Sequence, residues 1–186
     1  MYELFILGEL KDKPMHGYLL QYVLGKIIGP DRKMSWGVLY PLLQRLTKEG
    51  YITQTLQEQS GPGRPKKILK ITDKGLSRFD ELMEEPAEYD QNTEDLFHIK
   101  LSNFHHINEK LRLAILEQHK SYLLYLLDYV EENRSLVMDQ EEIKNDEKTS
   151  INSVLTHRSK RIEADLQWLK QEMEHVKEEK YDTGEK

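Results

Sequence analysis

The sequence predicts a mainly helical fold with one small β-hairpin, split into a domain at residues 1–86 and a long-helix domain at residues 87–186. Three observations predict it. Apolar residues recur at helical spacing along most of the chain. Two segments rich in β-formers flank a loop that holds two glycines and two prolines. A heptad pattern runs close to the C-terminal end, as it does in coiled coils.

Charge is distributed unevenly along the 186 residues, whose formal net charge is −6. Residues 1–80 hold 13 Lys and Arg against 8 Asp and Glu, whereas residues 81–186 hold 14 against 25. A basic first part suits nucleic acid, because the local field decides that contact; chance asymmetry is the alternative. No apolar run approaches the roughly 20 residues that span a bilayer, no secretory signal is visible, and there is no cysteine. We therefore predict a cytoplasmic protein without a membrane partner.

Two helices open the chain, at residues 2–10 and 15–28. Pro14 separates them, because the residue before a proline disfavours the helical conformation. The second helix is expected to pack on the first through an apolar stripe. That stripe consists of Leu19, Leu20, Val23, Leu24 and Ile27.

A third helix is predicted from Ser35 to Gly50, since these are residue types that begin and end helices. Proline is tolerated only near the first turn, so Pro41 indicates a helix start close to Trp36. The apolar side consists of Val38, Leu39, Leu42, Leu43 and Leu46. The opposite side combines hydrogen-bonding tips, aromatic surface and positive charge, as a helix in a DNA major groove needs. The alternative is an ordinary amphipathic helix with a solvated face.

A β-hairpin follows, with strands at residues 51–58 and 66–72, and a further helix runs on to Glu85. The hairpin tip carries Arg64, Lys66 and Lys67, which suit phosphates or a minor groove; a solvated basic turn is the alternative. Three helices, a hairpin and another helix are the order of a winged helix-turn-helix, whose third helix enters the major groove.

Three blocks within the first 80 residues resemble PadR-family transcriptional regulators. They are Met15–Tyr18, Gly37–Ile52, and Gly63–Lys67 followed by Leu69–Gly75. The resemblance implies a DNA-binding regulator that dimerises through its C-terminal helices. It also implies a response to phenolic acids, drugs or other signals.

The second domain is predicted to contain a short helix at residues 94–101 and two long helices, at residues 107–134 and about 150–179. The first long helix is apolar on two faces and therefore needs two packing partners. The second carries the heptads, which we interpret as a homodimer contact; an intramolecular hairpin is the alternative. The residues predicted at the dimer contact are Leu111, Leu123, Leu127, Leu155, Ile162, Leu166, Leu169, Met173 and Val176.

Trp168 flanks the heptad seam. In the simpler interpretation it covers the edge of the seam. In the other, it forms an aromatic wall of an effector cavity between the two domains, together with Phe97, Tyr122 and Tyr125.

Motifs of catalysis are missing from the sequence. It has no Gly-rich phosphate loop, no Ser/His/Asp motif and no cluster at metal-ligand spacing. His105 and His106 are adjacent, so on a helix they are expected to point about 100° apart. We therefore predict no enzyme activity, no cofactor and no metal site.

Together these observations predict a homodimeric DNA-binding transcriptional regulator, a ligand-responsive repressor that binds an operator with paired half-sites. The alternative is a non-catalytic adaptor that uses the winged helix and the coiled coil to bind proteins. The residues predicted to contact DNA are Lys33, Ser35, Trp36, Gly37, Tyr40, Gln44, Arg45, Lys48, Arg64, Lys66 and Lys67.

Overall fold

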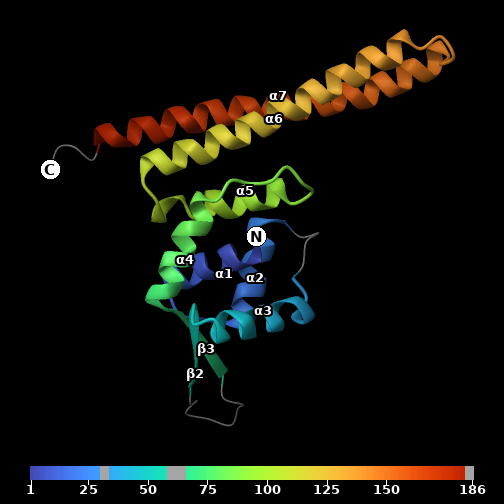
Figure 1. The fold of residues 1–186 in the computed structure, drawn as a ribbon. Coiled ribbons are helices and arrows are strands. Elements are labelled where there is room, and N and C mark those ends of the chain that lie inside the picture. The colour runs from blue at the N-terminus through green and yellow to red at the C-terminus, as the bar shows by residue number, and fades with distance from the viewer. Residues whose placement is uncertain (30–33, 58–65, 183–186) are drawn as a thin grey trace. The chain divides into compact units, whose positions relative to one another are not determined.

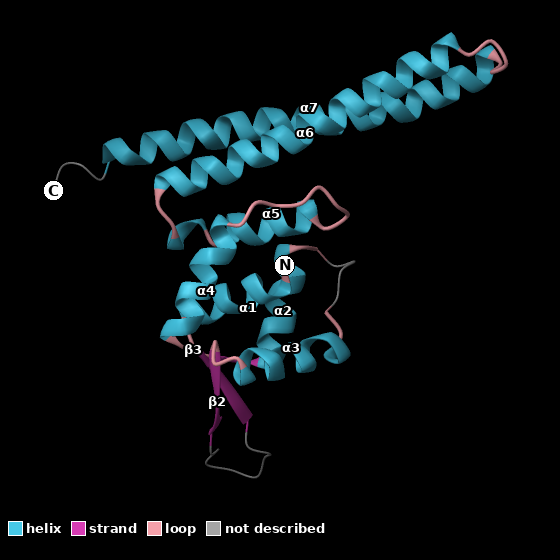
Figure 2. Cartoon of the chain, viewed as in Figure 1, coloured by secondary structure: helices cyan, strands magenta, loops and turns pink. Residues whose placement is uncertain are grey.

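The computed structural model describes residues 1–29, 34–57 and 66–182 and divides the chain into two compact units. Unit 1 comprises Met1–His106, and unit 2 begins at Ile107. Helices dominate both units, and the strands lie in unit 1 (Figure 2). The predicted fold class, mainly helical with a small β-hairpin, is confirmed. The domain boundary predicted after residue 86 stays a prediction, since the division by contacts falls 20 residues later along the chain.

Unit 1 is built around its first helix. The helical elements of this unit are α1 (Tyr2–Asp12), α2 (Gly17–Ile27), α3 (Trp36–Lys48), α4 (Asp73–Glu84), α5 (Thr93–Ser102) and the 3-10 turn η1 (Phe104–His106). Leu4, Phe5, Ile6 and Leu7 are four consecutive residues of α1, and each is at most 1% exposed. A helix that is apolar all round belongs in an interior. The helices α2, α4 and α5 and the sheet pack against α1.

The sheet contains one strand more than the sequence predicted. Its strands are β1 (Met15–His16), β2 (Ile52–Gln57) and β3 (Lys66–Ile71), antiparallel and in the order β1-β3-β2. β2 and β3 form the predicted hairpin. The prediction that the second helix starts at Met15 is wrong, because Met15 pairs with Leu69 and α2 begins at Gly17. A strand of only two residues is too short to show an alternating pattern in the sequence, so β1 could not be predicted.

The ends of α3 and α4 follow the predicted capping residues. α3 begins at Trp36 with Ser35 as its N-cap, as the position of Pro41 indicated. It ends before Gly50, whose φ of 78° is a conformation that favours glycine. The hydroxyl of Thr72 accepts a hydrogen bond from the N–H of Gly75 at 3.1 Å and so caps α4.

Unit 2 is a hairpin of two long helices, α6 (Glu109–Asp139) and α7 (Asn145–Asp182), which run antiparallel and side by side (Figure 1). Both are longer than predicted, so the predicted charged connection at residues 136–150 is wrong over most of its length. Its charged residues stay helical because charge on the outer face does not disturb packing on the inner one. No helix in the described ranges is both long enough and apolar enough to cross a membrane.

The heptad face of α7 packs on α6 of the same chain. Its buried positions recur every seven residues and are Leu155, Ile162, Leu169 and Val176. Ser159 lies among them at 4% exposure; its Oγ accepts a hydrogen bond from Arg134 at 3.1 Å and lies 3.1 Å from a carboxylate oxygen of Glu131. A buried polar cluster of this kind specifies the register of two helices. In a single chain, α6 and α7 therefore form the intramolecular hairpin, which was one of the two alternatives that the sequence allowed.

Candidate nucleic-acid interface

α3 exposes the side that the sequence assigned to DNA. Trp36 is 46% exposed and Tyr40 is 52% exposed, and Gln44 and Lys48 continue the exposed face toward the end of the helix. The opposite side is buried through Leu39, Leu43 and Leu46. Val38 departs from its predicted place on the apolar side, since it is 44% exposed. One surface of α3 is therefore anchored in unit 1 while the other presents aromatic, amide and ammonium groups.

An aromatic pocket of about 320 Å³ adjoins this exposed face. Its lining comes from α3, from the start of α2 and from the hairpin, and includes Tyr18, Trp36, Tyr40, Gln44, Gln54, Leu56 and Lys67. The rings of Trp36 and Tyr40 lie 6.0 Å apart at an interplanar angle of 52°. Apolar walls with a few amide and ammonium tips suit contacts to base edges, thymine methyl groups and phosphates.

Close packing positions α3 against the start of α2 and the sheet. A Cβ on Gly17 would lie 3.5 Å from a methyl carbon of Leu43, an ordinary van der Waals distance, so α2 begins beside the side chain of Leu43. Nδ1 of His16 lies 2.9 Å from the carbonyl oxygen of Lys67 and ties β1 to β3. Gln54 donates a hydrogen bond to the hydroxyl of Thr47 at 2.8 Å. The hairpin and α3 are thereby held in one fixed arrangement.

Arg45 is occupied by contacts within the protein. It forms ion pairs with Glu3 of α1 and, at 3.0 Å, with Glu49. Glu3 also accepts a hydrogen bond from Arg78 of α4 at 2.8 Å, so one carboxylate joins three helices. Burial acts to raise the pKa of Glu3, but hydrogen bonds from Arg45 and Arg78 outweigh it and lower the pKa below its ordinary value. The sequence interpreted Arg45 as a DNA contact; the structure places it in this network.

The basic residues outside α3 that were assigned to DNA are only partly within the described ranges. Lys33 and Arg64 lie outside them. Lys66 begins β3, but its side chain is not among those described. Lys67 is exposed and lines the aromatic pocket. Of these four residues, Lys67 is therefore the one that the described structure places beside Tyr40 and Gln44, in the lining of the aromatic pocket.

Sequence reasoning missed four polar or exposed lining residues of the aromatic pocket, besides its glycine and its buried leucines. They are His16, Tyr18, Gln54 and Leu56. Tyr18 and Leu56 are 57% and 67% exposed, which is unusual for large apolar side chains. Gln54 and Leu56 stand two residues apart and so share one face of β2. That alternation was a usable signal, whereas the place of Tyr18 depended on the unpredicted strand β1.

The predicted dimer and effector residues fall in different surroundings. Five of the nine dimer residues are buried within unit 2: Leu123, Leu155, Ile162, Leu169 and Val176. Among the effector residues, Phe97 is 6% exposed in unit 1, whereas Tyr125 and Trp168 are 55% and 39% exposed in unit 2. Both assignments stay predictions.

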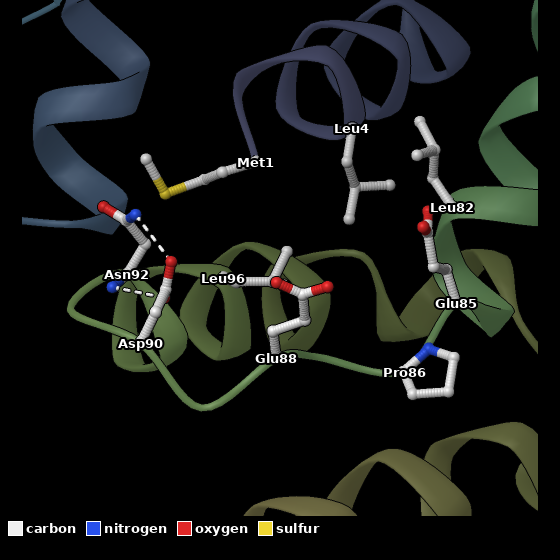
Figure 3. A pocket seen from close by; sticks show the side chains of 9 residues that line it. All are labelled: Met1, Leu4, Leu82, Glu85, Pro86, Glu88, Asp90, Asn92 and Leu96. Carbon is white, nitrogen blue, oxygen red and sulfur yellow. Dashed lines mark hydrogen bonds between the residues drawn. The ribbon is translucent and has the colours of Figure 1, made fainter.

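A second pocket lies within unit 1 between α1, the end of α4 and α5 (Figure 3). Its volume is about 260 Å³. Leu4, Leu82 and Leu96 provide apolar lining, and Glu85 and Glu88 bring carboxylates to it. The pocket thus combines an apolar lining with acidic side chains.

The order of helices, the hairpin beside α3 and the exposed face of α3 define a winged-helix DNA-binding protein. Residues 6–81 match the transcriptional regulator PadR-like family. A PadR-like transcription factor from Bacteroides fragilis is 30% identical, and the match covers 43% of this chain and 74% of that one at a TM-score of 0.39.

Two other solved structures match nearly the whole chain. Bacillus subtilis PadR, crystallised with operator DNA, is 20% identical over 94% of this chain and 98% of that one, at a TM-score of 0.45. The protein smu.1604c from Streptococcus mutans UA159 is 19% identical over 92% of this chain and 97% of that one, at a TM-score of 0.42. No curated protein matches the chain.

The chain belongs to the PadR-like family. It is a DNA-binding transcriptional regulator, and proteins of this family are regulators rather than enzymes. The predicted family and the predicted class of function are thereby confirmed.

Proposed function

We propose that this regulator is a ligand-responsive repressor that binds, as a homodimer, an operator with two half-sites. The observation that carries the proposal is the exposed face of α3, where Tyr40 and Gln44 lie beside the aromatic pocket and Lys67. Bound at the start of a transcription unit, such a protein blocks polymerase. The protein acts in the cytoplasm, where the DNA is.

The proposed contacts divide into two kinds. Gln44 and Tyr40 read base edges in the major groove, since an amide pairs with adenine and an aromatic ring packs on thymine methyl groups. Lys48 and Lys67, with Arg64 of the hairpin loop, bind phosphates and position the helix without reading sequence. Arg45 holds α3 on α1 and α4 and acts on DNA only through that support.

Dimerisation supplies the second α3 that a paired site requires. Supporting it, α6 carries an apolar stripe on a face other than its seam with α7. The stripe consists of Tyr122, Tyr125, Tyr129 and Leu136, spaced by three, four and seven residues. Tyr125, Tyr129 and Leu136 are 55%, 54% and 63% exposed in the single chain. A second copy of the chain that covers this stripe would give α6 the second partner that its two apolar faces need.

Variants of the two kinds of DNA contact give different results if the proposal holds. Binding is measured by fluorescence anisotropy on the region upstream of its own gene and on a library of related duplexes. Gln44→Ala is expected to cost about 1–3 kcal/mol at the preferred base and to change the order of preferred sequences. Lys67→Ala weakens all duplexes by a similar factor and reduces the salt dependence by about one counterion.

The control for these variants is Lys110→Ala, an exposed lysine of α6. It removes the same charge outside the proposed interface and is expected to bind DNA as the unchanged protein does. If Gln44→Ala and Lys67→Ala both left duplex binding intact, the α3 face would not be the DNA contact. Capture of a protein through that face would then favour the adaptor alternative.

A small-molecule effector completes the proposal. The acidic, leucine-lined pocket of Figure 3 supports a small cationic ligand in unit 1, and the family resemblance supports a ligand response. Phe97 of unit 1, and Tyr122, Tyr125 and Trp168 of unit 2, do not line this pocket and remain separate proposals for aromatic effector contacts. A ligand screen that follows Trp36 and Trp168 fluorescence identifies ligands, and a Glu88 variant then tests whether they bind in the acidic pocket. Replacement of Glu88 by Gln that left the affinity for every cationic hit unchanged would reject the acidic pocket as the site.

A further inference from the structure

Two adjacent histidines and one aspartate converge in unit 1, on elements other than α3 and the hairpin. Nε2 of His105 and Nε2 of His106 each lie 3.1 Å from the same carboxylate oxygen of Asp12. All three potential ligand atoms lie within 4.8 Å of one another. The expectation that adjacent histidines diverge is wrong here. They close a single 3-10 turn, η1, and both rings turn toward Asp12 with centroids 3.9 Å apart.

The spacing of these atoms matches the geometry of a metal coordination shell. Ligands at about 2.0–2.1 Å from a tetrahedral Zn²⁺ lie roughly 3.3 Å from one another, and cis ligands of an octahedral ion lie slightly closer. The two 3.1 Å separations at Asp12 fall in this range. Two imidazole nitrogens and one carboxylate oxygen are also a donor set that first-row divalent metals accept.

We propose that Asp12, His105 and His106 form a binding site for one divalent transition-metal ion of the Zn²⁺, Co²⁺ and Ni²⁺ class. Three protein ligands leave at least one coordination position for water. Glu9 stands three residues before Asp12 on the same face of α1, one helical turn away, and is a candidate to fill that position directly or through water.

An unsatisfied polar atom supports a ligand at this place. Nε2 of His106 is buried, and within the described residues it has no hydrogen-bond partner, although it lies 3.1 Å from Asp12. Buried polar atoms are rarely left in that state, because the loss of hydration is uncompensated. A metal ion held by His106 and Asp12 would satisfy this nitrogen.

Neighbouring side chains allow a cation here. Lys11 adjoins Asp12 in sequence, but its ammonium pairs with Asp80 at 3.3 Å and lies over the ring of Phe79 at 4.4 Å to the centroid. The same ring meets His106 edge-on at 5.7 Å and fixes one side of the imidazole. Lysine charge near the site is therefore partly offset by Asp80.

The site would join two distant parts of the chain. Asp12 ends α1, and His105 lies 93 residues further along, next to the last residue of unit 1. A bound ion would close this long loop and fix η1 immediately before the chain enters α6. The proposal concerns metal binding alone and does not depend on which operator or effector the protein recognises.

Calorimetric titration of Zn²⁺ into the tag-free, chelator-treated full chain tests the site. One ion per chain is expected to bind, together with a rise in the melting temperature of unit 1. Asp12→Asn and His105→Ala alter exposed side chains and so preserve the fold; each is expected to weaken Zn²⁺ binding by about tenfold or more. His106→Gln is expected to do the same.

The matched control is His157→Ala, which removes an exposed histidine of α7. It is expected to retain the one-to-one binding and the shift in melting temperature. The proposal is overturned if the unchanged protein shows no saturable one-to-one binding. It is equally overturned if Asp12→Asn and His105→Ala bind Zn²⁺ as tightly as His157→Ala does.

Discussion

The two units stabilise their helices in different ways. In unit 1, side chains from distant elements join the helices: Glu3 binds Arg45 and Arg78, and Lys100 donates hydrogen bonds to the carbonyls of Met83 and Glu85 at the end of α4. Unit 2 has one seam between α6 and α7 and leaves apolar residues such as Tyr129 exposed. Unit 1 therefore holds its helices through polar contacts among several elements, whereas unit 2 depends on a single apolar seam.

The largest effect is expected from Leu169→Ala in the seam of unit 2. Leu169 is fully buried, so its truncation removes apolar contact and leaves a cavity, at a cost of about 2–5 kcal/mol. Denaturant unfolding followed at Trp168, in a Trp36→Phe background, measures the loss. Val154→Ala is the control in the same helix, because Val154 is 53% exposed and is expected to change little. Equal losses in both variants would contradict the single-seam description of unit 2.

An intermediate effect is expected from Glu3→Gln in unit 1. Glutamine keeps the size but loses the charge that Arg45 and Arg78 share, and partial exposure of both arginines limits the loss to about 1–2 kcal/mol. Because the pKa of Glu3 is lowered on folding, its stabilisation is present above the ordinary pKa and is lost as the pH falls through the lowered one. The variant should therefore show a flatter loss of stability in acid.

The measurement for Glu3→Gln is urea unfolding at several acidic and neutral pH values, followed at Trp36 in a Trp168→Phe background. Glu94→Gln is the matched control, since Glu94 is an exposed residue in the first turn of α5. A Glu3→Gln protein whose stability and acid profile match those of Glu94→Gln would show that the network does not hold unit 1 together.

The smallest effect per step of pH concerns the pH dependence that Lys100 contributes. Burial lowers the pKa of Lys100 from 10.5 to about 8. Between these values the unfolded chain binds more protons than the folded one, so stability from this group rises with pH by about 1 kcal/mol per pH unit. Lys100→Met should remove that slope in unfolding measured from pH 8 to 10, whereas Lys110→Met should keep it. A slope unchanged in Lys100→Met would contradict the buried ammonium.

Much of the DNA-binding half was predictable because its signals are local. Ser35, Pro41 and Gly50 define the limits of α3 through caps and proline geometry, which depend on neighbouring residues alone. Helical periodicity likewise predicted Leu39, Leu43 and Leu46 as buried. Once the buried side of α3 was predicted, the remaining positions were expected on the exposed side. Trp36, Tyr40 and Gln44 are indeed exposed.

The remaining features depended on contacts between distant residues. Arg45 is of a residue type that often contacts DNA, and only the position of Glu3 on α1 shows that it also pairs with a carboxylate of the same chain. Likewise, His105 and His106 become a cluster only because η1 ends beside Asp12.

The sequence by itself determined the helical periods, the caps, the hairpin and the two-faced character of α6, since each is set by residues within a few turns of one another. Only the tertiary structure decided that Met15 pairs with β3, that α7 pairs with α6 of the same chain, and that Asp12 meets two histidines. The physical reason is the same in each case. Local conformation follows from sterics and capping along the chain, whereas partner choice follows from how all the buried surfaces fit together at once.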